Sequence, residues 1–218
     1  MDENKITEQC KSFTNQEAAC FTTSCFGMLS FAGDNFLAWY QDEILSIWNE
    51  RNLPLDENLF SIGFEKLEQG LKNSASYESD VFLHEHYSNS YLNGDDGSFD
   101  SIVGFFINIP TDLATIANSL LSGADIKKTV GLLDRKIFGA CLSMMAVRAI
   151  LCYALFNDSE PGNPEYQQEF DSSPCLVQAE RDLQYAIELA KREKIIPRGE
   201  RKWDYEFFGY PSGGPKVS

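Results

Sequence analysis

The two histidines of this 218-residue chain are nearly adjacent, in the run His84-Glu85-His86. If this run is a strand, both imidazoles point to the same face and, with one carboxylate, could bind a transition metal. If it is a helix, the two side chains point about 200° apart and cannot share a metal. A small enzyme or metal-binding protein that uses these three residues is therefore the alternative interpretation of the chain.

Other catalytic and cofactor-binding patterns are missing from the sequence. It contains no G-x-S-x-G motif, no Walker loop and no G-x-G-x-x-G pattern. The loop around Asp95 and Asp96 has the composition of a calcium loop, but placing Gly94 at the sixth position puts Tyr91 third and Asp100 twelfth. A calcium loop needs a bidentate glutamate at the twelfth position. We therefore assign no catalytic residue and expect no cofactor and no metal.

The net charge is strongly negative, −15 at pH 7, because 33 Asp and Glu outnumber 18 Lys and Arg. Residues 42–100 carry a net charge of −10 and residues 158–190 carry −7, whereas the tail from residue 191 is net positive. Solubility alone is one explanation of such a charge. The other is function, because a negative surface repels nucleic acids and anionic membranes and attracts basic proteins. We expect a basic protein partner, with no direct contact to nucleic acid or membrane.

The most apolar stretch runs from residue 137 to 156, where only Gly139, Ser143 and Arg148 are polar or lack a side chain. Twenty apolar residues suffice to cross a ~30 Å hydrocarbon layer, so a membrane anchor is one interpretation. Against it, Arg148 near the centre of the layer would cost about 2.5–3.5 kcal/mol. Apolar residues also continue upstream at helical spacing. We therefore predict a helix over about 125–157, buried on all sides, in which Arg148 pairs with a carboxylate.

Capping residues and apolar periodicity predict helices on both sides of this stretch. Thr14 and Glu17 form a capping box before a helix that Gly33 ends, and Asp34 is expected to cap the next helix. Four further apolar faces are Leu37, Tyr40, Ile44, Ile47 and Trp48; Phe60, Phe64, Leu67 and Leu71; Leu113, Ile116, Ala117, Leu120 and Leu121; and Leu176, Ala179, Leu183, Ala186 and Ala190.

The predicted fold is mainly α: a single domain over residues 1–218, built as a bundle of about seven to eight helices around 125–157. Residues 78–108 fit either a helix or a strand, and residues 158–173 are expected to form a loop before a helix that begins at Pro174. The aromatic and basic tail, 195–218, is expected to pack on the bundle.

Cysteine spacing and the first residues of the chain bear on its location. The six cysteines contain no C-x-x-C pair, and the sequence MDENKITEQCKSF lacks the basic and apolar regions of a signal peptide. We therefore expect reduced thiols and a cytoplasmic protein.

A strongly negative, motif-free helical protein favours binding over catalysis. We expect an inhibitor whose Asp and Glu side chains stand where phosphates would bind on a cationic nuclease toxin or nucleic-acid-binding effector. In this general character, although in no motif, the chain is similar to bacterial immunity proteins and phage anti-defence proteins. The acidic residues expected to contact the partner are Asp42, Glu43, Glu50, Glu57, Glu65, Glu68, Asp95 and Asp96.

Overall fold

A computed structural model describes part of the chain, and that part is helical. The described residues are 3–39, 59–73, 109–122, 136, 139–141, 143–145, 147–148, 164–165 and 167–203. Of the residues described, 81% are helical and none lies in a strand, which confirms the predicted mainly-α fold class. The ambiguous region 78–108 lies outside the described residues.

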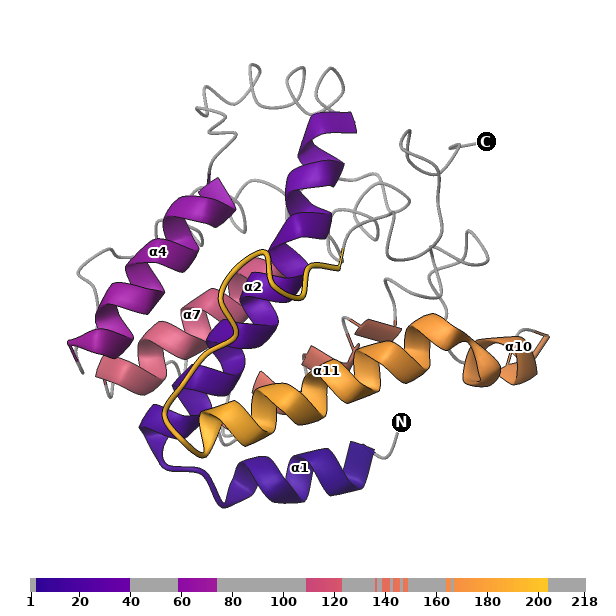
Figure 1. Ribbon diagram of the computed structural model, residues 1–218, viewed down its shortest axis with the longest axis horizontal. Helices are drawn as coiled ribbons and strands as arrows, with labels where there is room; N and C mark the ends of the chain where they lie inside the picture. Colours follow the sequence, from indigo (N-terminus) through magenta and orange to yellow (C-terminus); the bar gives the residue numbers. More distant parts are fainter. Residues whose placement is uncertain are drawn as a thin grey trace, which may run out of the picture.

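Helix α2 (Asn15–Trp39) is the central element of the described part. It packs against α4 (Leu59–Lys72), α7 (Ile109–Ser122) and α11 (Pro174–Ala190), as Figure 1 shows. Every residue from 18 to 30 of α2 is buried. A helix buried on every side has to lie in the core, where neighbouring helices cover all its faces. In the described part, α2 therefore has the role that the sequence analysis gave to 125–157.

The apolar stretch around residue 140 is described at nine helical positions between 136 and 148. Ala140 and Met144 are buried, but Cys141 is exposed and Met145 keeps 48% of its surface accessible. Because Cys141 and Met145 are one helical turn apart, they lie on the same face. The predicted burial on all sides is therefore wrong for this face.

The region 158–173, expected to be a loop, includes the short helix α10 (Gln167–Ser172). Phe170 is buried and fixes this helix against the core. The guanidinium carbon of Arg148 lies 5.8 Å from the centroid of the Phe170 ring, within range of a cation–π interaction. The carboxylate partner expected for Arg148 stays a prediction.

Among the helices that the structure describes, none has the length and apolar character needed to cross a membrane. Most of residues 137–156, the stretch considered as a membrane anchor, lie outside the described residues.

Helix α2 continues through Gly33 and Asp34 to Trp39, so the predicted end of this helix at Gly33 is wrong. A glycine inside a helix costs about 1 kcal/mol relative to alanine, and tertiary packing readily offsets such a cost. Gly33 is buried, which is consistent with this explanation. Asp34 does not cap a new helix; it pairs with Arg198, from the far end of the sequence.

The predicted capping box at the start of α2 is confirmed. The backbone N–H of Thr14 donates to the Glu17 carboxylate at 2.7 Å, and the backbone N–H of Glu17 donates to the Thr14 hydroxyl at 3.1 Å. Both N–H groups would otherwise lack a partner within the helix.

Replacing Thr14 with alanine is expected to lower the free energy of unfolding by about 1 kcal/mol, because the first turn of α2 loses its side-chain acceptor. Urea denaturation followed by circular dichroism measures the change. Thr14→Ser keeps the hydroxyl and is expected to stay within a few tenths of a kcal/mol of the wild type. Equal stability of the alanine variant and the wild type would contradict the capping role.

The apolar faces predicted for α4, α7 and α11 are confirmed. Helix α7 begins at Ile109, and Pro110 fits its first turn because no intrahelical bond is needed there. The buried members of the three faces are Phe60, Phe64 and Leu67; Leu113, Ile116, Ala117 and Leu120; and Leu176, Ala179, Leu183, Ala186 and Ala190. Leu71 and Leu121 pack against this core while partly exposed.

Helices α2 and α4 meet closely at Gly27. A Cβ atom at this position would lie 2.5 Å from Cε2 of Phe64. The Phe64 ring cannot easily move aside, because it is buried and stacks on Phe26 with the ring centroids 6.5 Å apart. The absence of a side chain at Gly27 therefore sets how closely the two helices pack.

After α11 the chain turns at residues 191–194 and runs back across α2, as the yellow trace in Figure 1 shows. Glu193 in this turn has a left-handed backbone conformation, with φ at 53°. We call residues 195–203 the C-terminal strap. The rest of the predicted tail, 204–218, lies outside the described residues.

Two buried residues anchor the C-terminal strap. Ile196 and Trp203 each expose 1% of their surface. The backbone N–H of Ile196 donates to the Ser24 hydroxyl at 3.0 Å, and that of Trp203 donates to the Met28 carbonyl at 3.1 Å. The strap is therefore part of the packed core and not an appendage on its surface.

Candidate functional site

Two of the eight acidic residues predicted to contact a partner lie in the described part, Glu65 and Glu68 on α4. Glu65 is exposed, and the Glu68 carboxylate lies 3.2 Å from Nζ of Lys72. An exposed ion pair of this kind contributes little to stability but partly neutralises the local charge. The other six lie outside the described residues: Asp42, Glu43, Glu50, Glu57, Asp95 and Asp96.

The residues considered as metal ligands, His84, Glu85 and His86, also lie outside the described residues. Within the ranges that the structure describes, no three His, Cys, Asp or Glu side chains are grouped so as to hold a metal ion.

The negative charge is unevenly divided between the described residues and the rest of the chain. The described residues contain 15 Asp and Glu and 13 Lys and Arg, a net charge of −2. The remaining residues contain 18 acids and five bases, a net charge of −13. The described residues therefore carry little of the net charge of the chain.

Arg198 of the C-terminal strap contacts three residues near the end of α2. Its guanidinium group pairs with the Asp34 carboxylate, and its Nε donates to the Ser30 hydroxyl at 3.1 Å. Its Cζ lies 4.3 Å from the centroid of the Phe31 ring, and Nζ of Lys202 lies 5.7 Å from the same centroid. We call Ser30, Phe31 and Asp34 the guanidinium site, because together they supply a charge, an acceptor and an aromatic face.

Burial has the largest effect on the ionisation of Asp34. It raises the pKa of this carboxyl from its ordinary value of 3.8 to about 6, and Arg198 opposes the shift through its charge and hydrogen bond. Desolvation disfavours the charged form of an acid, whereas a nearby cation favours it. The direction of the shift means that the single cation does not fully compensate the buried charge.

Stability should therefore depend on pH at Asp34. Because its pKa is higher in the folded protein than in the unfolded chain, the folded state binds the proton more tightly. The stabilising contribution is full below pH 4 and is lost as the pH rises to about 6. We expect the difference in unfolding free energy between the wild type and Asp34→Asn to fall over that range, as measured by denaturation at pH 4, 5, 6 and 7. A difference that grows with pH would show that Arg198, and not burial, dominates.

A second cluster holds the other end of the strap on α11. Asp182 exposes 3% of its surface and pairs with Arg201. It also accepts hydrogen bonds from Nε1 of Trp203 at 3.3 Å and from Nε2 of Gln178 at 2.9 Å. The Arg201 Cζ lies 4.6 Å from the centroid of the Tyr185 ring. Three donors thus satisfy a buried carboxylate, which is what makes its burial tolerable.

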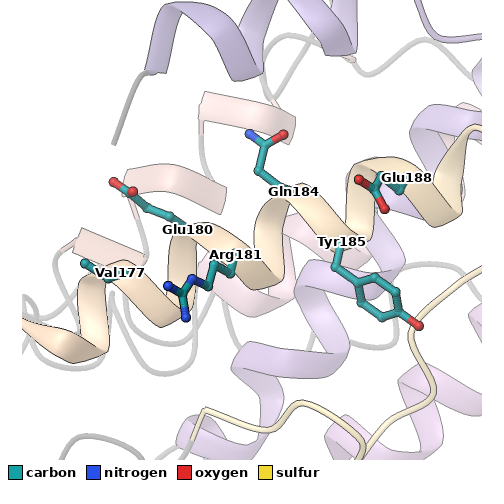
Figure 2. Close-up of a pocket in the computed structure, with 6 residues that line it drawn as sticks. All are labelled: Val177, Glu180, Arg181, Gln184, Tyr185 and Glu188. Atoms are coloured by element: carbon teal, nitrogen blue, oxygen red, sulfur yellow. The ribbon is translucent and has the colours of Figure 1, made fainter.

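An open hollow of about 390 Å³ lies along the outer face of α11. Its lining residues, drawn in Figure 2, are Val177, Glu180, Arg181, Gln184, Tyr185 and Glu188. The spacing of four residues places Glu180, Gln184 and Glu188 in one row along the helix, and the other three in a neighbouring row. Tyr185, which contacts Arg201 of the strap, lies at one side of the hollow. Because the hollow is open, it suits the side chains of a protein partner better than a small molecule, which usually binds in an enclosed pocket.

The buried cysteines do not offer a nucleophile. Burial raises the pKa of the thiols of Cys10, Cys20 and Cys25 to about 12 in each case. The thiolate, which is the reactive form, is therefore scarce at neutral pH. The cysteines in the described part of the chain are free thiols.

Sequence reasoning missed both carboxylates that hold the strap. Asp34 was interpreted as a helix cap. A usable signal existed for Asp182, since it lies three residues after Ala179 and four before Ala186, on the apolar face of α11. A carboxylate on such a face needs a buried cationic partner.

Comparison with protein-family models, curated proteins and solved structures gave no match to this chain.

Proposed function

We propose that the protein binds a basic protein through its acidic surface and inhibits it. The observation that carries the proposal is the excess of acidic residues: 33 Asp and Glu against 18 Lys and Arg, with net charges of −10 in residues 42–100 and −7 in residues 158–190. Folding has no use for that excess, because net charge of one sign destabilises the compact state through self-repulsion. A cationic partner supplies the compensating charge.

The strap makes nucleic acid a poor alternative partner. The tail from residue 191 is the most basic segment, but Arg198 and Arg201 are bound by the carboxylates of Asp34 and Asp182. While these guanidinium groups are held in this way they do not neutralise phosphates, and counterion release from phosphates supplies most non-specific nucleic-acid affinity. In the unbound protein these two arginines therefore serve the fold.

The partner that fits this charge is a protein whose own site binds phosphates, such as a nuclease or a nucleic-acid-binding effector. Carboxylates arranged on the inhibitor would occupy the positions of the phosphates and block substrate access. Glu65 on α4 and Glu188 beside the α11 hollow are exposed carboxylates of the described part that would contribute. Asp42, Glu43 and the other predicted acidic residues would supply the rest.

Affinity capture at two salt concentrations tests the proposal. The immobilised protein is incubated with a lysate of the cells that express it, at 50 mM and 500 mM NaCl. We expect it to retain a partner with a basic isoelectric point at low salt and to release it at high salt, because salt screens interactions between exposed charges. We also expect the captured partner's nuclease or nucleic-acid-binding activity to fall when the protein is added.

Charge reversal at matched positions separates the predicted face from net charge. Glu65→Lys with Glu68→Lys changes the net charge as much as Glu165→Lys with Glu169→Lys does, but only the first pair lies on the predicted face. We expect the first pair to weaken capture at least ten-fold and the second pair to have a much smaller effect. Capture that resists 500 mM NaCl, or equal losses in both variants, would remove the proposal.

A further inference from the structure

The guanidinium site takes its cation from a distant part of the chain. Asp34 lies five residues before Trp39, the last residue of α2, and the last turn of this helix contains no basic residue. Arg198 of the strap supplies the cation that pairs with Asp34.

Arg198 fits this site incompletely. One guanidinium nitrogen pairs with one oxygen of Asp34, and Nε is used by Ser30. The other carboxylate oxygen of Asp34, Oδ1, is buried and has no hydrogen-bond partner among the described residues. An arginine that approached Asp34 in the plane of the carboxylate could donate to both oxygens, which is the stronger arrangement. The raised pKa of Asp34 is consistent with this incomplete compensation.

The strap does not depend on Arg198 for its attachment. Ile196 and Trp203 are buried on either side of it and are held by backbone hydrogen bonds to α2. Gly199, which follows Arg198, is exposed and has φ at 94°, a conformation that glycine adopts without strain. The Arg198 side chain can therefore leave the guanidinium site while both anchors stay in place.

We propose that the guanidinium site is a receptor for an arginine of the basic partner, and that Arg198 occupies it only in the unbound protein. The proposal rests on the proposed function. The occupant is an arginine because the site offers a carboxylate, a hydroxyl acceptor and a ring face, which a planar guanidinium can use together and an ammonium group cannot. Arg198 then keeps Asp34 paired until the partner arrives.

The position of the site in the chain suits such an exchange. Asp42 and Glu43, the first residues of the predicted acidic face, follow the end of α2 within a few positions. A tethered side chain competes at an effective concentration of order millimolar, so a free arginine displaces Arg198 poorly. A partner that also contacts the acidic segment presents its own arginine at a comparable local concentration, and exchange becomes favourable.

Binding of a small probe to full-length variants tests the receptor. Arg198→Met empties the charged position but keeps an apolar stem beside Phe31. We expect N-acetyl-arginine amide to bind this variant at least ten-fold more tightly than the wild type, with NMR shifts centred on Phe31 and Asp34. N-acetyl-citrulline amide, which has the same shape without the charge, is expected not to bind. Adding Asp34→Asn to Arg198→Met is expected to abolish binding of the arginine probe.

Arg198→Lys is the second variant and keeps a cation beside Asp34, so it protects against a loss of folding. Circular dichroism and Trp203 fluorescence check that both variants keep the strap in place. If neither variant binds the arginine probe more tightly than the wild type, or if Asp34→Asn leaves binding unchanged, the receptor is disproved. The probe experiment requires no partner. If the arginine probe binds Arg198→Met but capture of a partner resists 500 mM NaCl, the proposed function is removed and the guanidinium site stands.

Discussion

Replacing Trp203 with alanine is expected to lower the free energy of unfolding by about 3–5 kcal/mol, the usual cost of deleting a buried large aromatic side chain. Trp203 exposes 1% of its surface and is one of the largest fully buried side chains of the described part. Its backbone N–H donates to Met28 of α2, and its Nε1–H donates to Asp182 of α11. The substitution therefore opens a cavity and removes one donor from a buried carboxylate.

Two comparisons separate these contributions. Trp203→Phe keeps most of the aromatic volume but loses the N–H, so we expect a smaller loss of about 1–3 kcal/mol. Val177→Ala, at a position 40% exposed on α11, is the control and should change stability by less than about 0.5 kcal/mol. Circular dichroism must report the unfolding, because the variants remove a fluorophore. A loss below about 1 kcal/mol for Trp203→Ala would mean that the strap is not part of the cooperative core.

Replacing Gly27 with alanine is expected to lower the free energy of unfolding by about 1–3 kcal/mol, although alanine is the better helix former by about 1 kcal/mol. The added methyl group would lie 2.5 Å from the Phe64 ring, so α2 and α4 have to move apart or the ring has to leave its stack on Phe26. Crowding wins over helix propensity because the core around the ring is fully packed.

The compensating variant Phe64→Leu tests this explanation directly. In its background the methyl group of Gly27→Ala has room, so the same substitution should become neutral or stabilising. The double-mutant cycle is expected to give a coupling energy of about 1–3 kcal/mol between the two positions. Additive effects would show that the cost at Gly27 arises from something other than contact with Phe64.

Local chemistry made several elements predictable. The capping box of Thr14 and Glu17 depends on neighbouring residues only, and Ser173-Pro174 marks a helix start for the same reason. The buried faces of α4, α7 and α11 follow from apolar residues every three or four positions. These signals require no knowledge of the rest of the chain.

The central position of α2 could not be read from the sequence. Its buried part contains Thr22, Thr23, Ser24 and Ser30, and hydroxyl residues usually indicate an exposed helix or its ends. In the structure, three of these hydroxyls donate to carbonyl groups of the preceding turn, such as Thr22 to Ala18 at 2.8 Å. The helix thereby satisfies three of these four hydroxyls itself, and it accepts burial that its composition does not suggest.

The pairing of the strap was also beyond sequence reasoning. The tail was expected to pack on the bundle, and several clusters of Asp and Glu could have paired with its basic residues. The residues used were instead single carboxylates, Asp34 and Asp182, each on an otherwise buried helix face. Arg198 and Asp34 are 164 positions apart, so only the tertiary fold brings them together.

The hydroxyls of Ser24 and Ser30 have a consequence for how the chain acquires its structure. Each accepts a hydrogen bond from the strap, and the partners are 172 and 168 positions away. During synthesis, the side of α2 that contacts α11 and the strap therefore stays uncovered until those segments have been made. Such long-range closure is slow, and the waiting intermediate exposes apolar surface. Premature termination anywhere before residue 203 would leave that intermediate permanently open, a ready substrate for chaperones and proteases.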